Sequence, residues 1–136
     1  MIGAYLLDTN VISGLLNGDR IIIEKLQQVQ LLGAEVFISC ITYYEVLRGL
    51  LAVNASRKML IFSEFCKEVT IAFIDNIQII EKAAEIHADL KLRGTPIQEA
   101  DIFIAATAIT RGLILVSNDS DMLRVRGVTV ENWFAT

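Results

Sequence analysis

Tyr5-Leu6-Leu7-Asp8-Thr9-Asn10 is the stretch of sequence that decides the fold. Three largely apolar residues run directly into a carboxylate, a hydroxyl and an amide, which is typical of a buried strand that ends at a sheet edge. In open α/β sheets the ligand crevice lies outside the carboxyl ends of the strands, so Asp8 is a candidate functional acid. The alternative is that Asp8 only caps a helix that begins at Val11, since Asp is a good N-cap residue.

The composition indicates a single domain over residues 1–136 with a substantial hydrophobic core. Hydrophobic residues make up 54% of the chain, but charged residues interrupt every apolar stretch well before the ~20 residues that a membrane span needs. The beginning of the chain lacks the basic region and long apolar segment of a signal peptide. We therefore expect a cytoplasmic protein with no membrane segment.

Charge and cysteine usage narrow the classes of function. The net charge of -4 argues against broad nonspecific binding of nucleic acids. It does not exclude a nucleic-acid enzyme, because cations bound by carboxylates make the local electrostatic potential positive. Cys40 and Cys66 lie in apolar segments without a CxxC pattern or a neighbouring histidine, so we expect buried free thiols and no zinc site.

Apolar periodicity predicts strands that alternate with helices. The expected strands cover residues 5–7, 36–39, 70–74, 113–116 and, at an edge, 128–130. The expected helices cover residues 11–16, 20–32, 43–51, 56–66, 76–93 (capped by Asp75) and 98–111. This alternation predicts an α/β fold, a three-layer α/β/α domain around a central parallel sheet of four to five strands.

Four carboxylates fall where this fold brings strand ends and helix starts together. Asp8 ends the first strand, and Asp119 follows the fourth. Glu45 and Asp101 lie in the expected first turns of their helices. Four acids at one sheet edge would repel one another unless a cation lies between them, and oxygen ligands of this kind suit Mg²⁺ or Mn²⁺. Two such ions can activate water and stabilise the leaving oxygen of a phosphodiester.

Each acid also has a purely structural interpretation. Glu45 fits a capping box with Thr42, and the helix dipole favours an acid at Asp101. Asp119 and Asp121 fit an ordinary Asx turn. For any single acid the structural interpretation is the stronger one, and it is the conjunction of the four that favours a metal site.

Four segments of the chain carry a resemblance, in order and in spacing, over nearly its whole length. They are Tyr5-Leu6-Leu7-Asp8-Thr9-Asn10, Ile38-Ser39-x-x-Thr42-x-x-Glu45-Val46-x-x-Gly49, Pro96-Ile97-x-x-Ala100-Asp101-x-x-Ile104-Ala105-Ala106-Thr107-Ala108 and Leu115-Val116-Ser117-Asn118-Asp119-x-Asp121. With them the chain resembles the PIN-domain ribonucleases, in particular the VapC-type toxins of prokaryotic toxin–antitoxin pairs. The family often has Thr and Phe where this chain has Ser117 and Met122.

The resemblance implies a PIN-like fold and endonucleolytic cleavage of RNA that depends on Mg²⁺ or Mn²⁺. The implied catalytic acids, which would also hold the metal, are Asp8, Glu45, Asp101 and Asp119. Hydroxyls that steady these acids would come from Thr9 and Ser117, and Asp121 would be an auxiliary acid.

The resemblance also implies two protein partners, a small antitoxin that blocks the site and a second copy of the toxin. The helices expected over residues 43–51 and 56–66 carry more apolar side chains than one core face needs, and we place the antitoxin groove there. These side chains are Leu47, Leu50, Leu51, Met59, Leu60 and Phe62. The basic residues nearest the acidic segments, which could contact RNA phosphates, are Arg48, Arg111, Arg124 and Arg126. For each arginine, a solvated surface position or an ion pair such as Glu45–Arg48 is the simpler interpretation.

Three other functions compete with this interpretation. A non-catalytic PIN-like module that works only by binding a protein would have no need of four acids. A receiver domain needs paired acids early in the chain and a lysine after a late strand, which are lacking here. A haloacid-type phosphatase needs an Asp-x-Asp pair, and Asp8-Thr9-Asn10 has only its first member. The only histidine, His87, lies in the expected long helix, where we expect it on the surface or on an apolar face.

Overall fold

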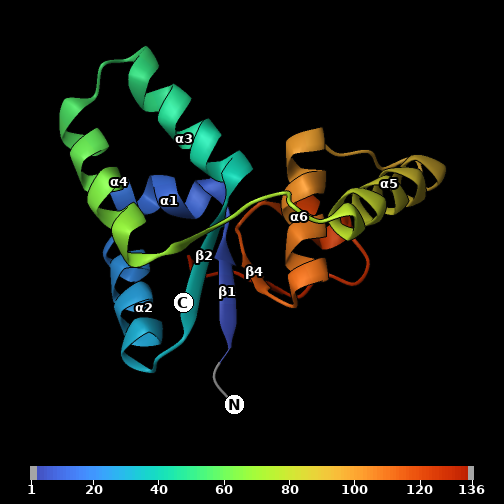
Figure 1. The fold of residues 1–136 in the computed structure, drawn as a ribbon, viewed down its shortest axis with the longest axis horizontal. Coiled ribbons are helices and arrows are strands. Elements are labelled where there is room, and N and C mark those ends of the chain that lie inside the picture. Colours follow the sequence, from blue (N-terminus) through green and yellow to red (C-terminus); the bar gives the residue numbers. More distant parts are fainter. Residues whose placement is uncertain (1–2, 135–136) are drawn as a thin grey trace.

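The computed structural model describes residues 3–134. Within this range the chain forms a five-stranded parallel sheet in the order β3-β2-β1-β4-β5, with helices on both faces (Figure 1). The strands are β1 (Ala4–Leu7), β2 (Glu35–Ser39), β3 (Thr70–Ala72), β4 (Ile114–Val116) and β5 (Val130–Glu131). The predicted three-layer α/β fold is confirmed for the described residues; the ends of the domain expected over 1–136 lie outside them.

Two hydrophobic cores, one on each face of the sheet, hold the layers together. Leu6 and Leu115 point into the core beneath α5 (Ile77–Leu92) and α6 (Glu99–Arg111). Their neighbours Leu7 and Val116 point into the core on the other face, as the alternation of side chains along a strand requires. Four helices cover that second face: α1 (Thr9–Leu16), α2 (Arg20–Leu31), α3 (Cys40–Ala52) and α4 (Ser56–Glu68). None of the helices within residues 3–134 has the length and apolar character needed to cross a membrane.

The strand order reverses direction at β1, and this reversal positions the candidate site. β1 pairs with β2 on one side and with β4 on the other, with Leu7 opposite both Ile38 and Val116. A crevice opens outside the carboxyl ends of the strands at such a switch point. Asp8 and Ser117 directly follow the paired residues Leu7 and Val116, and the Asp8 N–H donates to the Val116 carbonyl at 2.9 Å.

The helix after β2 begins earlier than expected, which removes one interpretation of Glu45. α3 begins at Cys40, and its N-cap is Ser39, whose hydroxyl accepts a hydrogen bond from the Ile41 N–H at 3.0 Å. Thr42 is therefore already inside the helix, and Glu45 lies in the second turn. The prediction of a capping box and of a first-turn position for Glu45 is wrong, because Ser39 already supplies the cap.

Three further expectations need correction. The cap of α5 is Asn76, whose side chain accepts from the Gln78 N–H at 2.8 Å, whereas Asp75 instead lies 3.5 Å from the Arg111 guanidinium. The last strand, β5, begins at Val130, two residues later than the predicted range 128–130. Cys40 and Cys66 are free but only half-buried, not buried as expected. Burial raises the pKa of the Cys66 thiol.

A short 3₁₀ helix, η1 (Ser120–Arg124), follows β4. It occupies the segment that the sequence indicates as a polar turn. Asp119 is its N-cap and accepts a hydrogen bond from the Asp121 N–H at 2.9 Å. The Asx-turn interpretation of Asp119 is thus correct as a description of the local backbone, and the turn uses one carboxylate oxygen, Oδ1.

Candidate metal centre

Asp8 is a buried acid held from two sides. It is 3% exposed, and it is the N-cap of α1. One carboxylate oxygen accepts from the Thr9 N–H at 2.8 Å, and the other accepts from the Ser117 hydroxyl at 2.7 Å. Burial raises the pKa of Asp8, and the charges of Asp119 and Glu45 add to this rise, against the lowering effect of the two hydrogen bonds. Asp8 therefore both caps a helix and faces neighbouring acids.

Glu45 is tied to the end of β1 through the hydroxyl of Thr9. This hydroxyl donates to Glu45 Oε1 at 2.8 Å, and the hydroxyl oxygen of buried Thr42 lies 3.3 Å from it. Glu45 also lies 3.9 Å from the exposed guanidinium of Arg48, which stacks over the Tyr44 ring. The Glu45–Arg48 ion pair expected from the sequence is thus present.

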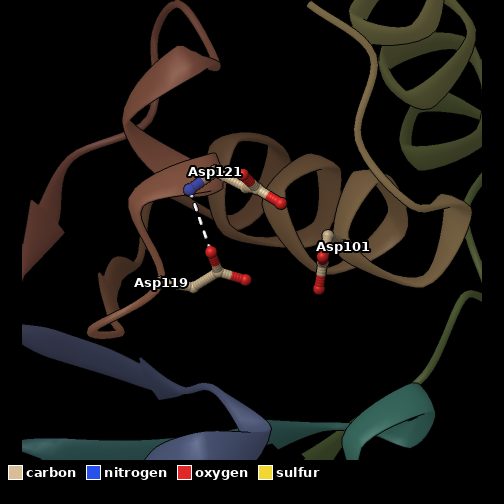
Figure 2. A group of neighbouring side chains, drawn as sticks. All are labelled: Asp101, Asp119 and Asp121. Carbon is tan, nitrogen blue, oxygen red and sulfur yellow. Dashed lines mark hydrogen bonds between the residues drawn. The ribbon is translucent and has the colours of Figure 1, made fainter.

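Asp101, Asp119 and Asp121 form the tightest group of acids. One carboxylate oxygen from each lies within 4.8 Å of the other two. Figure 2 shows these side chains between the start of α6 and the turn of η1, with β1, α1 and the start of α3 on the opposite side. Asp119 is joined to the Asp8 side of the site through its N–H, which donates to Ser117 Oγ at 3.0 Å.

The pKa of Asp101 shows that the acids act as one electrostatic unit. Desolvation by burial and, after it, the charges of four other acids together raise this pKa to about 6. These acids are Asp8, Asp119, Glu45 and Asp121, in decreasing order of effect. The other four carboxylates predicted for the site therefore lie within electrostatic reach of Asp101.

The donor set fits a hard divalent cation. Every candidate ligand is a carboxylate, which is the chemistry that Mg²⁺ and Mn²⁺ prefer over thiolate or imidazole. Within residues 3–134, two ion pairs reach the cluster, Arg48 with Glu45 at 3.9 Å and Arg124 with Asp121 at 3.3 Å. Both guanidiniums are exposed, so they offset little of the repulsion among five acids. A bound cation would offset it directly.

Two polar residues contribute to the site although neither was predicted from the sequence to take part in it. The Asn10 side-chain nitrogen lies 3.4 Å from Ser117 Oγ, and its oxygen accepts from the Asn118 N–H at 3.4 Å. Buried Thr42 supports Thr9. Asn10 and Thr42 both belong to the sequence motifs that follow strands. Short polar residues at the start of a helix are usually caps, so the sequence only weakly indicates a role in the site.

The other candidate residues lie away from the acids. Arg111 pairs with Asp75 at 3.5 Å, and Arg126 pairs with Asp89 at 3.7 Å. His87 is exposed on α5, which is the first of the two positions expected for it, the surface and an apolar face. Of the four arginines considered for RNA contact, Arg48 and Arg124 are thus the two that border the acidic cluster.

Comparisons with known proteins identify similar chains and folds. Residues 5–128 match the PIN domain family. The chain is 32% identical to ribonuclease VapC2 of Haemophilus influenzae over 133 residues, which covers 95% of this chain and 97% of that protein. It is 30% identical to the tRNA(fMet)-specific endonuclease VapC of Salmonella typhimurium over 98 residues, 71% of this chain and 74% of that one. The fold matches DNA-bound VapBC from Salmonella typhimurium with a TM-score of 0.84 at 28% identity, covering 98% and 99% of the two chains.

Proposed function

The chain belongs to the PIN domain family, and from this premise we propose that it is a metal-dependent endoribonuclease, the toxin of a toxin–antitoxin pair. The observation that carries the proposal is the convergence of five carboxylates at the carboxyl ends of β1 and β4. The 32% identity to a ribonuclease and the 30% identity to an RNA endonuclease support the same activity.

The acids are proposed to hold Mg²⁺ or Mn²⁺ at this edge of the sheet. The ligands would come from Asp8, Glu45, Asp101 and Asp119, with Asp121 as an auxiliary acid. When bound, such ions stabilise the charge that develops on a phosphodiester and lower the pKa of water. The protein's own part is to keep the carboxylates ionised, oriented and close together, although their mutual repulsion opposes this arrangement.

Hydroxyl groups of the chain orient the acids. Ser117 donates to Asp8 at 2.7 Å and accepts from the Asp119 N–H at 3.0 Å, so one side chain couples the ends of β1 and β4. Thr9 similarly couples the start of α1 to Glu45 on α3 at 2.8 Å. We propose that both are positioning residues, since they fix carboxylates that would otherwise rotate apart.

The proposed activity is tested by incubating the purified protein with RNA. We expect internal cleavage with added Mg²⁺ or Mn²⁺, complete loss of cleavage in EDTA, and recovery when excess divalent metal is restored. Gel electrophoresis of end-labelled RNA measures the cleavage positions. Undiminished cleavage in chelator would contradict the metal-dependent mechanism, and no cleavage under any metal condition would contradict the proposed activity.

The expected antitoxin surface is smaller than the sequence indicates. Of the six apolar residues considered on α3 and α4, Leu50 and Phe62 are buried in the core, and Leu47 and Met59 pack against it. Their burial follows from the contact of both helices with the second core. The exposed apolar side chains, here called the α3–α4 patch, are Tyr44, Leu51, Val53, Leu60 and Ile61. Exposed apolar side chains that gather on two neighbouring helices make this surface the candidate for a protein partner.

We propose that the α3–α4 patch binds the cognate antitoxin. Amide hydrogen exchange of α3 and α4 is expected to slow when that protein is added, whereas the exposed face of α5 on the far side of the sheet keeps its exchange rate. Unchanged exchange across α3 and α4 would rule out this surface.

Two further expectations stay predictions. The resemblance implies a toxin homodimer, which sedimentation velocity can measure. A cytoplasmic location is proposed because an RNA substrate would be met there.

A further inference from the structure

A groove of about 240 Å³ leads away from the candidate metal centre between α1, α3 and α4. At one end it is lined by Thr9 and Glu45, which already belong to the acidic site. At the other end it is lined by Asn17 and Lys58. Figure 1 shows α1 passing beside the hairpin formed by α3 and α4, which is where the groove runs.

The far end of the groove carries a fixed positive charge. The Lys58 ammonium on α4 donates to the side-chain oxygen of Asn17, the C-cap residue of α1, at 2.6 Å. A lysine ammonium has three N–H donors, so two are left for a ligand. Lys58 is the one basic residue among the described residues that line the groove. The groove thus runs from the acidic cluster to the ammonium group of Lys58.

The wall between these ends is apolar and open. It includes Leu16, Val46 and Leu50. Gly49 lies in the same wall, and a Cβ added there would meet no atom within 4 Å. A flat, weakly polar group can therefore lie against the helices at this point, and any side chain at position 49 would occupy its space.

We propose that the groove binds the nucleotide next to the cleaved phosphodiester of an RNA strand. The base lies against the apolar wall at Gly49, and the phosphate beyond it contacts Lys58. The inference rests on the proposed nuclease function, and it specifies the path by which the RNA strand leaves the metal centre. The volume is below the roughly 300–1,000 Å³ of pockets that enclose whole small ligands, which suits one unit of a longer chain.

Charge favours a nucleic-acid strand as the occupant. Phosphates repeat along an RNA strand. If metal ions hold one phosphate at the acidic cluster, the next phosphates of the strand lie outside the cluster, where a basic side chain can contact them. Lys58 supplies that cation at the opposite end of a groove continuous with the cluster. A segment of a protein partner is the competing occupant, and it would leave RNA affinity independent of this groove.

The test compares RNA affinity in three groove variants by fluorescence anisotropy of a labelled single-stranded RNA with Mg²⁺ present, all in an Asp101→Asn background in which cleavage is not expected. Lys58→Met is expected to weaken binding roughly three- to tenfold and to reduce the slope of log Kd against log salt by about 0.7. Gly49→Leu is expected to weaken binding roughly tenfold or more, because it fills the space of a stacked base. Gly49→Ala is expected to weaken binding less while raising Tm, since alanine favours a helix.

The matched control is Lys67→Met. Lys67 lies on the same helix, is exposed, and pairs with Glu64 at 3.0 Å away from the groove. We expect its RNA affinity, in the same background, to equal that of Asp101→Asn alone. Unchanged affinity in both Lys58→Met and Gly49→Leu, or an equal loss in Lys67→Met and Lys58→Met, would overturn the proposal while leaving the nuclease function in place. An unmodified protein that neither binds nor cleaves RNA would instead overturn the proposed function itself.

Discussion

Substitution of Asp101 by asparagine is expected to abolish RNA cleavage while the fold is retained. Asn has nearly the same shape, but it removes the negative charge of a proposed metal ligand from the acidic cluster. The loss should exceed the roughly 10- to 100-fold that removal of a residue behind the ligands typically causes. Initial rates of cleavage at saturating Mg²⁺ measure the loss, and circular dichroism with thermal melting measures the fold.

The control for Asp101→Asn is Glu99→Gln. Both acids lie in the first turn of α6, so each change removes a negative charge that interacts favourably with the same helix dipole. Glu99, however, lies outside the group that Asp101 forms with Asp119 and Asp121. Glu99→Gln is expected to keep full activity, whereas Asp8→Asn is expected to lose it as Asp101→Asn does. Full activity in both Asp8→Asn and Asp101→Asn would refute the proposed metal site.

A smaller effect is expected for the positioning residue Ser117. Ser117→Ala removes the hydrogen bond to Asp8 and should lower cleavage roughly 10- to 100-fold, since residues that orient metal ligands have effects of this size. Ser117→Thr keeps the hydroxyl and should restore most of the activity. A weaker apparent affinity for Mg²⁺ in Ser117→Ala, recovered in Ser117→Thr, would separate orientation of the acids from a general loss of stability.

The second large effect is expected on stability: divalent metal should raise Tm, and more at pH 7.5 than at pH 5.5. The pKa of Asp101 is raised to about 6 in the folded protein. Without metal, the stability that comes from protonating Asp101 is fully present below its unfolded pKa of about 3.9 and is lost as pH rises through about 6. The contribution is at most about 1–2 kcal/mol, because Asp101 is partly exposed and solvent screens it.

Metal binding should reverse this loss at high pH, because it neutralises the ionised acids without competition from protons. Metal at 100 times its Kd would stabilise the fold by about 2.7 kcal/mol, a rise in Tm of roughly 5–10 °C. Differential scanning fluorimetry with and without Mg²⁺ or Mn²⁺ at the two pH values measures both effects. In Asp101→Asn the metal-free protein should be less sensitive to pH between 5 and 7. An equal metal-induced rise at both pH values would contradict the assigned cluster.

Prediction of the local elements succeeded where apolar residues repeat with a clear period. The long helix α5 shows this, since Ile79, Ala83, Ile86 and Leu90 are spaced for one buried face and all are buried. Helix ends were less predictable, because several polar residues in a row can each act as the cap. Ser39 rather than Thr42 begins α3, and Asn76 rather than Asp75 begins α5.

Exposure of the apolar helices α3 and α4 also could not be predicted from their sequence. Leu50 and Leu51 are neighbours of the same type, yet Leu50 is 8% exposed and Leu51 is 58% exposed. Which one faces the core depends on how each helix is rotated against α1 and the sheet, and the sequence of an apolar helix leaves that rotation open. The same rotation decides that Gly49 lines an open groove.

The sequence by itself determined which chemical groups are present and at which ends of the elements they stand. An apolar run into Asp8, alternation of strands with helices, and acids at the other strand ends and helix starts were enough to predict the fold class and an oxygen-ligand site. Only the tertiary structure decided which groups meet. The reversal of strand order at β1 brings Asp8 beside Ser117, more than 100 positions away in the chain. Such contacts depend on the strand order β3-β2-β1-β4-β5, which is set by packing between segments that lie far apart in the chain.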